Sequence, residues 1–236
     1  MEFSRRNFLG GMAGVAALGT GLTAFGASAA WAEGRPDGKV ISSETALSYL
    51  KRGNLRWVAG KKNPKALKHF SFAPKGVAVE EGQWPIAAIV SCADSRVQPD
   101  ELFDLAPANL FVVRNAGNVI DDDVLGSLEY GVEHLGVSLI VTLGHSLCGA
   151  VKATEAVVNG GAMPGHHVDA LVNHIKPALS ALPKGHSLAE AVTANAKQSA
   201  ELAVSQSDVI DEFVKQGELK VVAATYDLVS RKVTWA

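Results

Sequence analysis

The sequence predicts an α/β protein built around a mainly parallel β-sheet. Short apolar runs at residues 85–92, 109–115 and 137–145 have the length and composition of strands buried on both faces. Segments with helical periodicity separate these runs, which is typical of strands joined by crossover helices. The composition, 47% hydrophobic and 19% charged, is that of a globular chain with a substantial core.

Residues 1–32 are expected to be an export signal and not part of this fold. Arg5 and Arg6 precede an apolar stretch rich in Gly and Ala, and residues 30–32 (Ala-Trp-Ala) fit a signal-peptidase cleavage site. This layout predicts a twin-arginine-type signal and an exported, periplasmic or otherwise extracytoplasmic protein. An uncleaved membrane anchor is the alternative, although leucine and isoleucine are few in the stretch.

The mature chain shows no sign of a nucleic-acid or membrane partner. It has 20 basic and 23 acidic residues, so it lacks the excess of positive charge that nucleic-acid binding requires. Beyond the signal, no segment is apolar over the ~18 residues that a membrane span needs. No stable membrane insertion of the mature chain is therefore expected.

The first elements of the mature chain come before the predicted strand 85–92. Residues 33–40 are expected to be a mobile lead-in, and residues 41–236 a single domain. Residues 42–61 begin with an N-cap serine and carry apolar side chains at helical spacing, which predicts one or two amphipathic helices. Prolines at positions 64 and 74 predict a loop over residues 62–82.

Helices and a final hairpin complete the pattern. Acidic residues at the start and Gly136 after the end bound one helical segment, and Asn159-Gly160 ends another. The predicted helices cover residues 122–136, 148–160, 165–181 and most of 187–216, and residues 218–236 read as a strand, a turn and a closing strand.

Candidate metal ligands follow two of the predicted strands. Cys92, Asp94 and Arg96 stand at the end of the first strand, and His145 and Cys148 at the end of the third. The carboxyl ends of parallel strands share one edge of a sheet, so these side chains are expected to meet. Two thiolates and an imidazole select zinc, and a set of three leaves a fourth position for water unless Asp94 fills it.

Other interpretations of these residues stay open. Cys92 and Cys148 could form a disulfide in an exported protein, giving a stapled binding domain. Cys92 and His145 could be a nucleophile and its base. Either cysteine could be an ordinary core residue, and Asp94 and Arg96 an ordinary salt bridge. A zinc-binding module without catalysis is a further alternative.

The chain resembles the β-class carbonic anhydrases in "SCADSR", "FVVRNAGN", "GSLEYGVEHLG", "GHSLCGAV" and the final "YDL". The resemblance runs from about Asn54 to the C-terminus. It implies a zinc lyase, with one Zn²⁺ per chain, that hydrates carbon dioxide to bicarbonate and a proton by attack of zinc-bound hydroxide. It also implies about four parallel strands with one antiparallel edge strand, and N-terminal helices that form a homodimer or a dimer of dimers.

The resemblance also assigns residues. Cys92, His145 and Cys148 match the zinc ligands, and Asp94 and Arg96 match the catalytic pair. Some relatives close the site by placing this aspartate on zinc and carry a tryptophan where this chain has Ile89, so the open form is expected here. Matches to the substrate pocket, which takes side chains from two subunits, are Gln83, Phe111, Ala116 and Tyr130. A hydrolase of carbonyl sulfide or carbon disulfide is the nearest rival activity.

Overall fold

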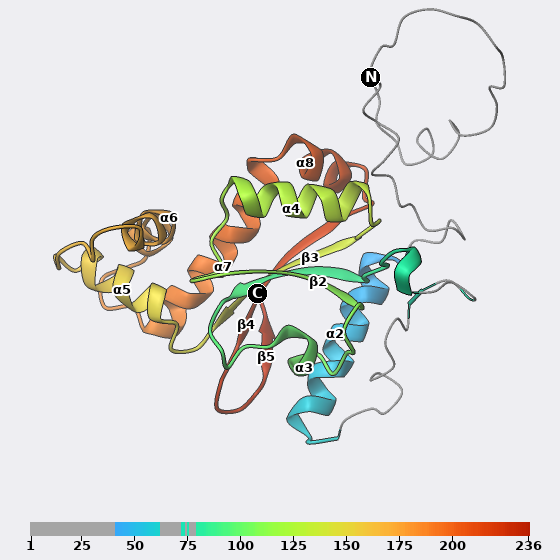
Figure 1. Cartoon of the computed structure of the whole chain (residues 1–236). Helices are drawn as coiled ribbons and strands as arrows, with labels where there is room; N and C mark the ends of the chain where they lie inside the picture. Colours follow the sequence, from blue (N-terminus) through green and yellow to red (C-terminus); the bar gives the residue numbers. More distant parts are fainter. Residues whose placement is uncertain (1–40, 62–71, 74, 76–78) are drawn as a thin grey trace, which may run out of the picture.

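A five-stranded sheet forms the centre of the molecule (Figure 1). The computed structural model describes residues 41–61, 72–73, 75 and 79–236. The expected export signal and the lead-in at 33–40 lie outside the described residues, as does most of the predicted loop 62–82. The strands are β1 (Ala87–Cys92), β2 (Leu110–Asn115), β3 (Leu139–His145), β4 (Lys220–Tyr226) and β5 (Val233–Trp235).

The strand order is β2-β1-β3-β4-β5, with all neighbours parallel except the pair β4 and β5. The prediction of four parallel strands and one antiparallel edge strand is therefore confirmed. β1 and β3, which carry the candidate ligands, are the two central neighbours, and every residue of both strands is buried. This explains their unbroken apolar runs, because helices cover both faces of the sheet.

The helices match the predicted segments, with one addition. They are α2 (Ser43–Val58), α3 (Pro99–Leu102), α4 (Asp122–Glu133), α5 (Gly149–Val158), α6 (Val168–Ser180), α7 (Leu188–Ser205) and α8 (Asp208–Lys215), besides a 3₁₀ turn, η1 (Val79–Glu81). The added element is α3, a single turn with proline in its first position. Its four residues are too few to show a helical period.

The segment 42–61 forms one helix, α2, which packs tightly against the turn after α3. The Ser42 side chain caps it by accepting a hydrogen bond from the Thr45 amide. Gly53 permits the close approach, because a Cβ there would lie 1.7 Å from the Phe103 carbonyl oxygen. Asn54 next to it donates to the carbonyl oxygens of Leu102 and Arg231. The helix is thus joined to both α3 and the β4–β5 hairpin.

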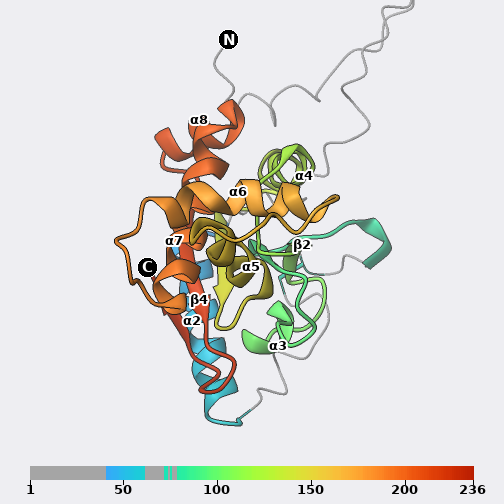
Figure 2. The same ribbon diagram turned by 90° about the vertical axis from the view of Figure 1, so that its left-hand side faces the viewer.

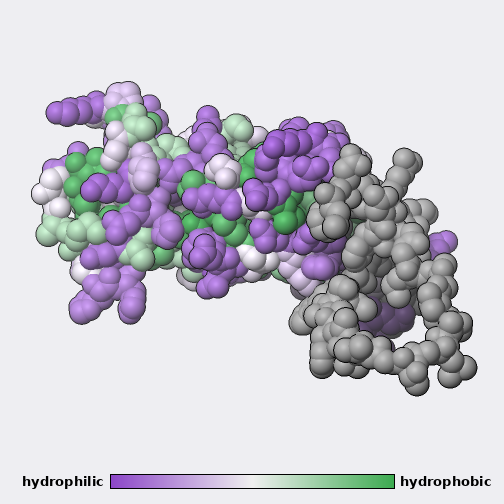
Figure 3. All heavy atoms as spheres, turned by 90° about the horizontal axis from the view of Figure 1, so that it is seen from above, coloured by the Kyte–Doolittle hydropathy of each residue, from purple (hydrophilic) through white to green (hydrophobic). Residues whose placement is uncertain are grey.

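Apolar side chains form three clusters around the sheet. In β1, Ala87 and Ile89 face the cluster that includes α2, and Ala88 and Val90 face the cluster that includes α4 and α8. Figure 1 shows these helices on opposite sides of the sheet, and Figure 3 shows hydrophilic side chains over much of the face seen from above. The third cluster contains Cys92 and residues of α5, α6 and α7. Figure 2 shows α5 and α6 in front of the sheet.

Among the described residues, no helix combines the length and the apolar character that crossing a membrane requires.

Candidate metal centre

Two neighbouring strand ends and one helix start bring three ligand groups together. Cys92 is the last residue of β1, His145 the last of β3, and Cys148 the N-cap residue of α5. Their ligand atoms all lie within 4.8 Å of one another, and all three residues are buried. Ligands of a tetrahedral zinc ion would stand about 3.5–3.8 Å apart, so small movements would complete such a site. Both cysteines are free thiols, so the structure contains no disulfide between them.

The orientation of His145 fits a metal ligand. Its Nδ1 lies 2.9 Å from the Ser146 carbonyl oxygen, which can only accept, so in the neutral ring the proton is on Nδ1. The other nitrogen, Nε2, is buried and has no hydrogen-bond partner in the described part of the chain. A buried lone pair is costly when unpaired, and a metal ion would satisfy it.

A hydrogen bond joins the two thiols. The hydrogen bond from Cys148, helped by the Gly117 amide, lowers the pKa of Cys92 to about 4, although burial opposes this shift. The hydrogen bond with Cys92 and burial together raise the pKa of Cys148. Cys92 therefore loses its proton more readily, whereas Cys148 keeps its proton. A divalent cation would displace it, because metals bind cysteine as thiolate.

Arg96 holds the Asp94 carboxylate through both oxygens. Its Nε and backbone N–H each donate to Oδ1 at 2.9 Å, and its Nη2 donates to Oδ2 at 2.7 Å. The side-chain hydrogen bonds, ahead of the backbone bond, hold the pKa of Asp94 well below its usual range, although burial opposes them. The carboxylate is therefore ionised at neutral pH, and Oδ2 lies 3.9 Å from His145 Nε2.

The loop after β2 supplies a hydrogen bond to the sulfur of Cys92. The Gly117 N–H donates to Cys92 Sγ at 3.4 Å. Asn115 shapes this loop by accepting from the Val119 N–H and donating to the Val119 carbonyl oxygen. Asn195 of α7 donates to the Gly117 carbonyl oxygen at 2.8 Å. Half-buried Ala116, a predicted pocket residue, comes directly before Gly117 in this loop.

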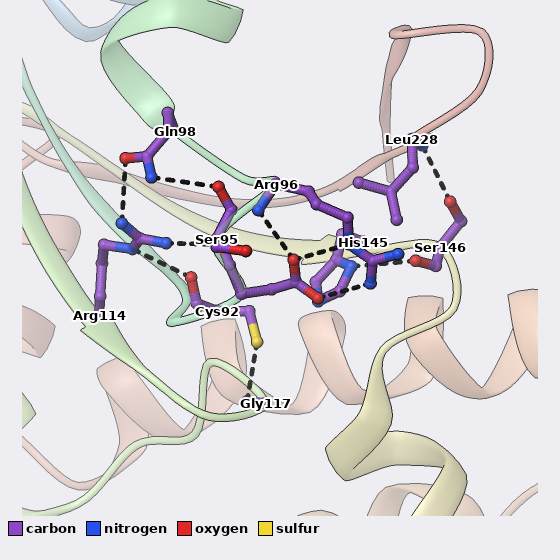
Figure 4. A network of polar contacts seen from close by, with 10 residues as sticks. Cys92, Ser95, Arg96, Gln98, Arg114, Gly117, His145, Ser146 and Leu228 are labelled. Atoms are coloured by element: carbon purple, nitrogen blue, oxygen red, sulfur yellow. Dashed lines mark hydrogen bonds and ion pairs between the residues drawn. The ribbon is translucent and has the colours of Figure 1, made fainter.

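Arg114 is a site residue that the sequence analysis missed. From β2 its guanidinium donates to the carbonyl oxygens of Cys92 and Asp94 and to the side chain of Gln98 (Figure 4). The sequence feature that could have identified it is an arginine near the end of a mostly apolar strand. Its targets are backbone atoms, which a sequence pattern does not identify.

Three of the predicted pocket residues do not lie beside the ligands within one chain. Phe111 pairs with Ala88, four residues before Cys92 in β1, which is about 13 Å along the strand. Tyr130 of α4 contacts Phe111, with ring centroids 6.2 Å apart. Gln83 precedes β1 and is half-buried. Their place in a substrate pocket stays a prediction that requires a second copy of the chain.

Comparisons with known proteins identify the family of this chain. The chain matches the family model described as carbonic anhydrase over residues 87–233. It is 40% identical over 186 residues to carbonic anhydrase 2 of Mycobacterium tuberculosis, which covers 78% of this chain and 87% of that protein. It is 42% identical over 134 residues to a carbonic anhydrase of Mycolicibacterium smegmatis, covering 57% of this chain and 63% of that one.

Solved structures define the class. The Coccomyxa β-carbonic anhydrase, solved in complex with acetazolamide, superposes with a TM-score of 0.61 and 27% identity over 66% of this chain and 74% of that one. One of the two tetrameric β-carbonic anhydrases of Sordaria macrospora shares the fold, with a TM-score of 0.55 and 23% identity over 66% and 82% of the two chains. The fold is that of a β-class enzyme. The chain belongs to the carbonic anhydrase family, whose activity is the hydration of carbon dioxide.

Proposed function

We propose that the chain is a zinc-dependent carbonic anhydrase that binds one Zn²⁺ through Cys92, His145 and Cys148. The observation that carries the zinc assignment is the meeting of two thiols with the unpaired, buried Nε2 of His145. Sulfur and imidazole ligands favour zinc over calcium or magnesium. Three protein ligands, and not four, are the number found in catalytic zinc sites.

The protein residues divide the catalytic work between them. When bound, zinc supplies a water molecule whose pKa is lowered from about 15.7 toward 7. Asp94, kept ionised by Arg96, can only accept hydrogen bonds, so it fixes the direction of an O–H group beside His145. Arg96 also keeps the carboxylate from becoming a fourth ligand, because both of its oxygens are already bonded.

The substrate pocket is completed by a second copy of the chain. The register places Phe111 and Tyr130 far from the ligands of their own chain, and β2, which carries Phe111, is the half-buried edge strand. On α2, Leu55 is 68% exposed and Tyr49 36%, which leaves apolar surface for a partner. The tetrameric assembly of the Sordaria macrospora enzymes supports a homodimer or a dimer of dimers here.

We further propose that the protein acts outside the cytoplasm. The paired Arg5 and Arg6 and the apolar stretch after them support export by a twin-arginine route. Replacing both arginines by lysine should keep the full-length chain in the cytoplasm of an expressing bacterium. Export of that variant at the wild-type level would refute this route.

The enzymatic proposal is tested by metal removal and return. Stopped-flow assays of carbon dioxide hydration should show activity in the purified protein, its loss after a chelator, and recovery with one equivalent of Zn²⁺ per chain. Parallel assays with carbonyl sulfide and carbon disulfide separate the rival hydrolase activity. Full activity in protein shown to be free of metal would refute the zinc assignment.

A further inference from the structure

We infer that Arg114 is a positioning residue that holds the turn 92–98 in the geometry that the metal centre needs. This turn carries both a candidate ligand, Cys92, and the Asp94 carboxylate. The inference rests on the proposed zinc-dependent function and adds to it the residue that fixes the first ligand and the carboxylate relative to each other.

The contacts of Arg114 point to three separate places on the turn. Its Nε donates to the Cys92 carbonyl oxygen at 3.1 Å, and its Nη2 donates to the Asp94 carbonyl oxygen at 2.7 Å. Its Nη1 donates to the Gln98 side-chain oxygen at 3.1 Å, and Gln98 in turn donates to the Ser95 carbonyl oxygen at 3.3 Å. One rigid guanidinium thus spans the turn from its first residue to its last (Figure 4).

The turn needs this support because the sheet ends before it. The β1–β2 ladder reaches Cys92 opposite Asn115, and the Ala93 N–H still donates to the Asn115 carbonyl oxygen. Beyond Ala93, the hydrogen bonds that the described residues of β2 make to this turn come from the Arg114 side chain. Within the turn, the Val97 N–H donates to the Asp94 carbonyl oxygen. Arg114 therefore continues the connection between the strands past the last backbone bond.

The chemistry of the side chain makes it hard to replace. A guanidinium is planar and presents its N–H groups in fixed directions, whereas a lysine ammonium is a single point of charge. In the described part of the chain, Arg114 pairs with two carbonyl oxygens and one amide oxygen, and with no carboxylate. Its contacts therefore depend on direction more than on charge, which is what positioning requires.

The test compares Arg114→Met and Arg114→Lys with a matched control, Arg56→Met. Arg56 is also half-buried, but it pairs with Asp104 between α2 and the turn after α3. For each variant and the wild type we would measure zinc affinity by chelator competition, kcat and KM separately, and the melting temperature of the metal-free protein.

Arg114→Met should weaken zinc binding and lower kcat/KM by about 10- to 100-fold each, as removal of groups that orient metal ligands usually does. The decrease in kcat/KM should come from a lower kcat, with KM little changed. Arg114→Lys should recover only a small part of this activity. Arg56→Met should lower the melting temperature while zinc affinity and kcat stay within about twofold of wild type, since its partner lies away from the ligands.

The inference is overturned if Arg114→Met lowers the melting temperature but keeps wild-type zinc affinity and kcat. Should that variant not fold, Gln98→Leu removes one of the three contacts and leaves Arg114 in place. It should lower kcat/KM by a few-fold with KM unchanged, and wild-type values would count against the inference in the same way. A wild-type chain that binds no zinc would instead refute the proposed function itself.

Discussion

The Arg96 side chain donates a hydrogen bond to each carboxylate oxygen of Asp94, and Asp94 Oδ2 lies 3.9 Å from His145 Nε2. The carboxylate is thus close to the candidate metal position but already bonded elsewhere. The side chain of Asp94 is 17% exposed and that of Arg96 55%, so the pair stands at the edge of the buried centre. This arrangement separates two roles that a carboxylate at a metal site could have, namely orienting a reactant and binding the ion.

Asp94→Asn should abolish most of the activity without loss of zinc. The amide cannot ionise, and it presents a donor where the wild-type group only accepts. We expect kcat/KM to fall by about 10²- to 10⁴-fold, the usual range for a group that handles a proton in the transition state. Zinc analysis of the same sample, together with stopped-flow kinetics, checks both statements. Wild-type kinetics in the variant would show that Asp94 is a structural residue.

Arg96→Met should destabilise the protein at neutral pH and have a smaller effect on its stability in acid. Arg96 lowers the pKa of Asp94, so the stability that their pairing adds is present above the ordinary aspartate pKa of about 3.9 and is lost as the pH falls toward the lowered value. Because Arg96 is more than half exposed, solvent screens the pair and its contribution to stability is expected to be small.

Urea unfolding of both proteins at pH 7 and pH 3 measures this effect. The gap in unfolding free energy between wild type and Arg96→Met should narrow at the lower pH. A gap that is equal at both pH values would mean that the pairing does not depend on the ionisation of Asp94.

Gly117→Ala should destabilise the loop that donates to Cys92. Gly117 has φ of +81°, and a Cβ there would lie 2.8 Å from Ile175 Cδ1 and 3.0 Å from Ala150 Cβ. Strain and crowding together should lower the free energy of unfolding by about 1–3 kcal/mol. Weaker zinc binding should accompany this change, because the same residue donates to the Cys92 sulfur.

Gly126→Ala is the matched control for this variant. Gly126 is an exposed residue of α4, and a Cβ there meets nothing within 4 Å. Alanine favours the helix by about 0.5–1 kcal/mol over glycine, so the control should be neutral or slightly stabilised. Equal changes in the free energy of unfolding for Gly117→Ala and Gly126→Ala would show that the loop geometry at Gly117 does not require glycine.

Two inactive variants should restore activity to each other if the pocket is shared between copies. Cys92→Ser removes a ligand and leaves Phe111 intact, whereas Phe111→Ala leaves the ligands intact. In a mixed dimer, one site is complete: its three ligands come from the Phe111→Ala chain, and the aromatic ring comes from the Cys92→Ser chain. The purified mixed dimer should show about half of the wild-type activity, since one of its two sites is complete.

Co-expression of the two variants with different tags, followed by kinetics on the purified mixed dimer, gives the measurement. The parent variants alone are the controls. A mixed dimer no more active than its parents would contradict the shared pocket and would place Phe111 in the core of its own chain.

The sequence alone predicted the sheet and the three converging ligands, because both depend on local patterns. Buried strands show as apolar runs, and the ends of neighbouring parallel strands meet at one edge. Less visible were α3, which is too short for a period, and Arg114, which acts on backbone oxygens across the sheet. The register that separates Phe111 from Cys92 is also a property of strand pairing and not of spacing in the chain.

The most direct test of the account is X-ray absorption at the zinc edge of the purified protein. We predict one zinc per chain with two sulfur neighbours at about 2.3 Å and two nitrogen or oxygen neighbours at about 2.0–2.1 Å. The two sulfurs would come from Cys92 and Cys148, one lighter neighbour from His145 and the other from solvent. A protein without metal whose two cysteines are joined in a disulfide, or a zinc ion without sulfur neighbours, would contradict the central claim.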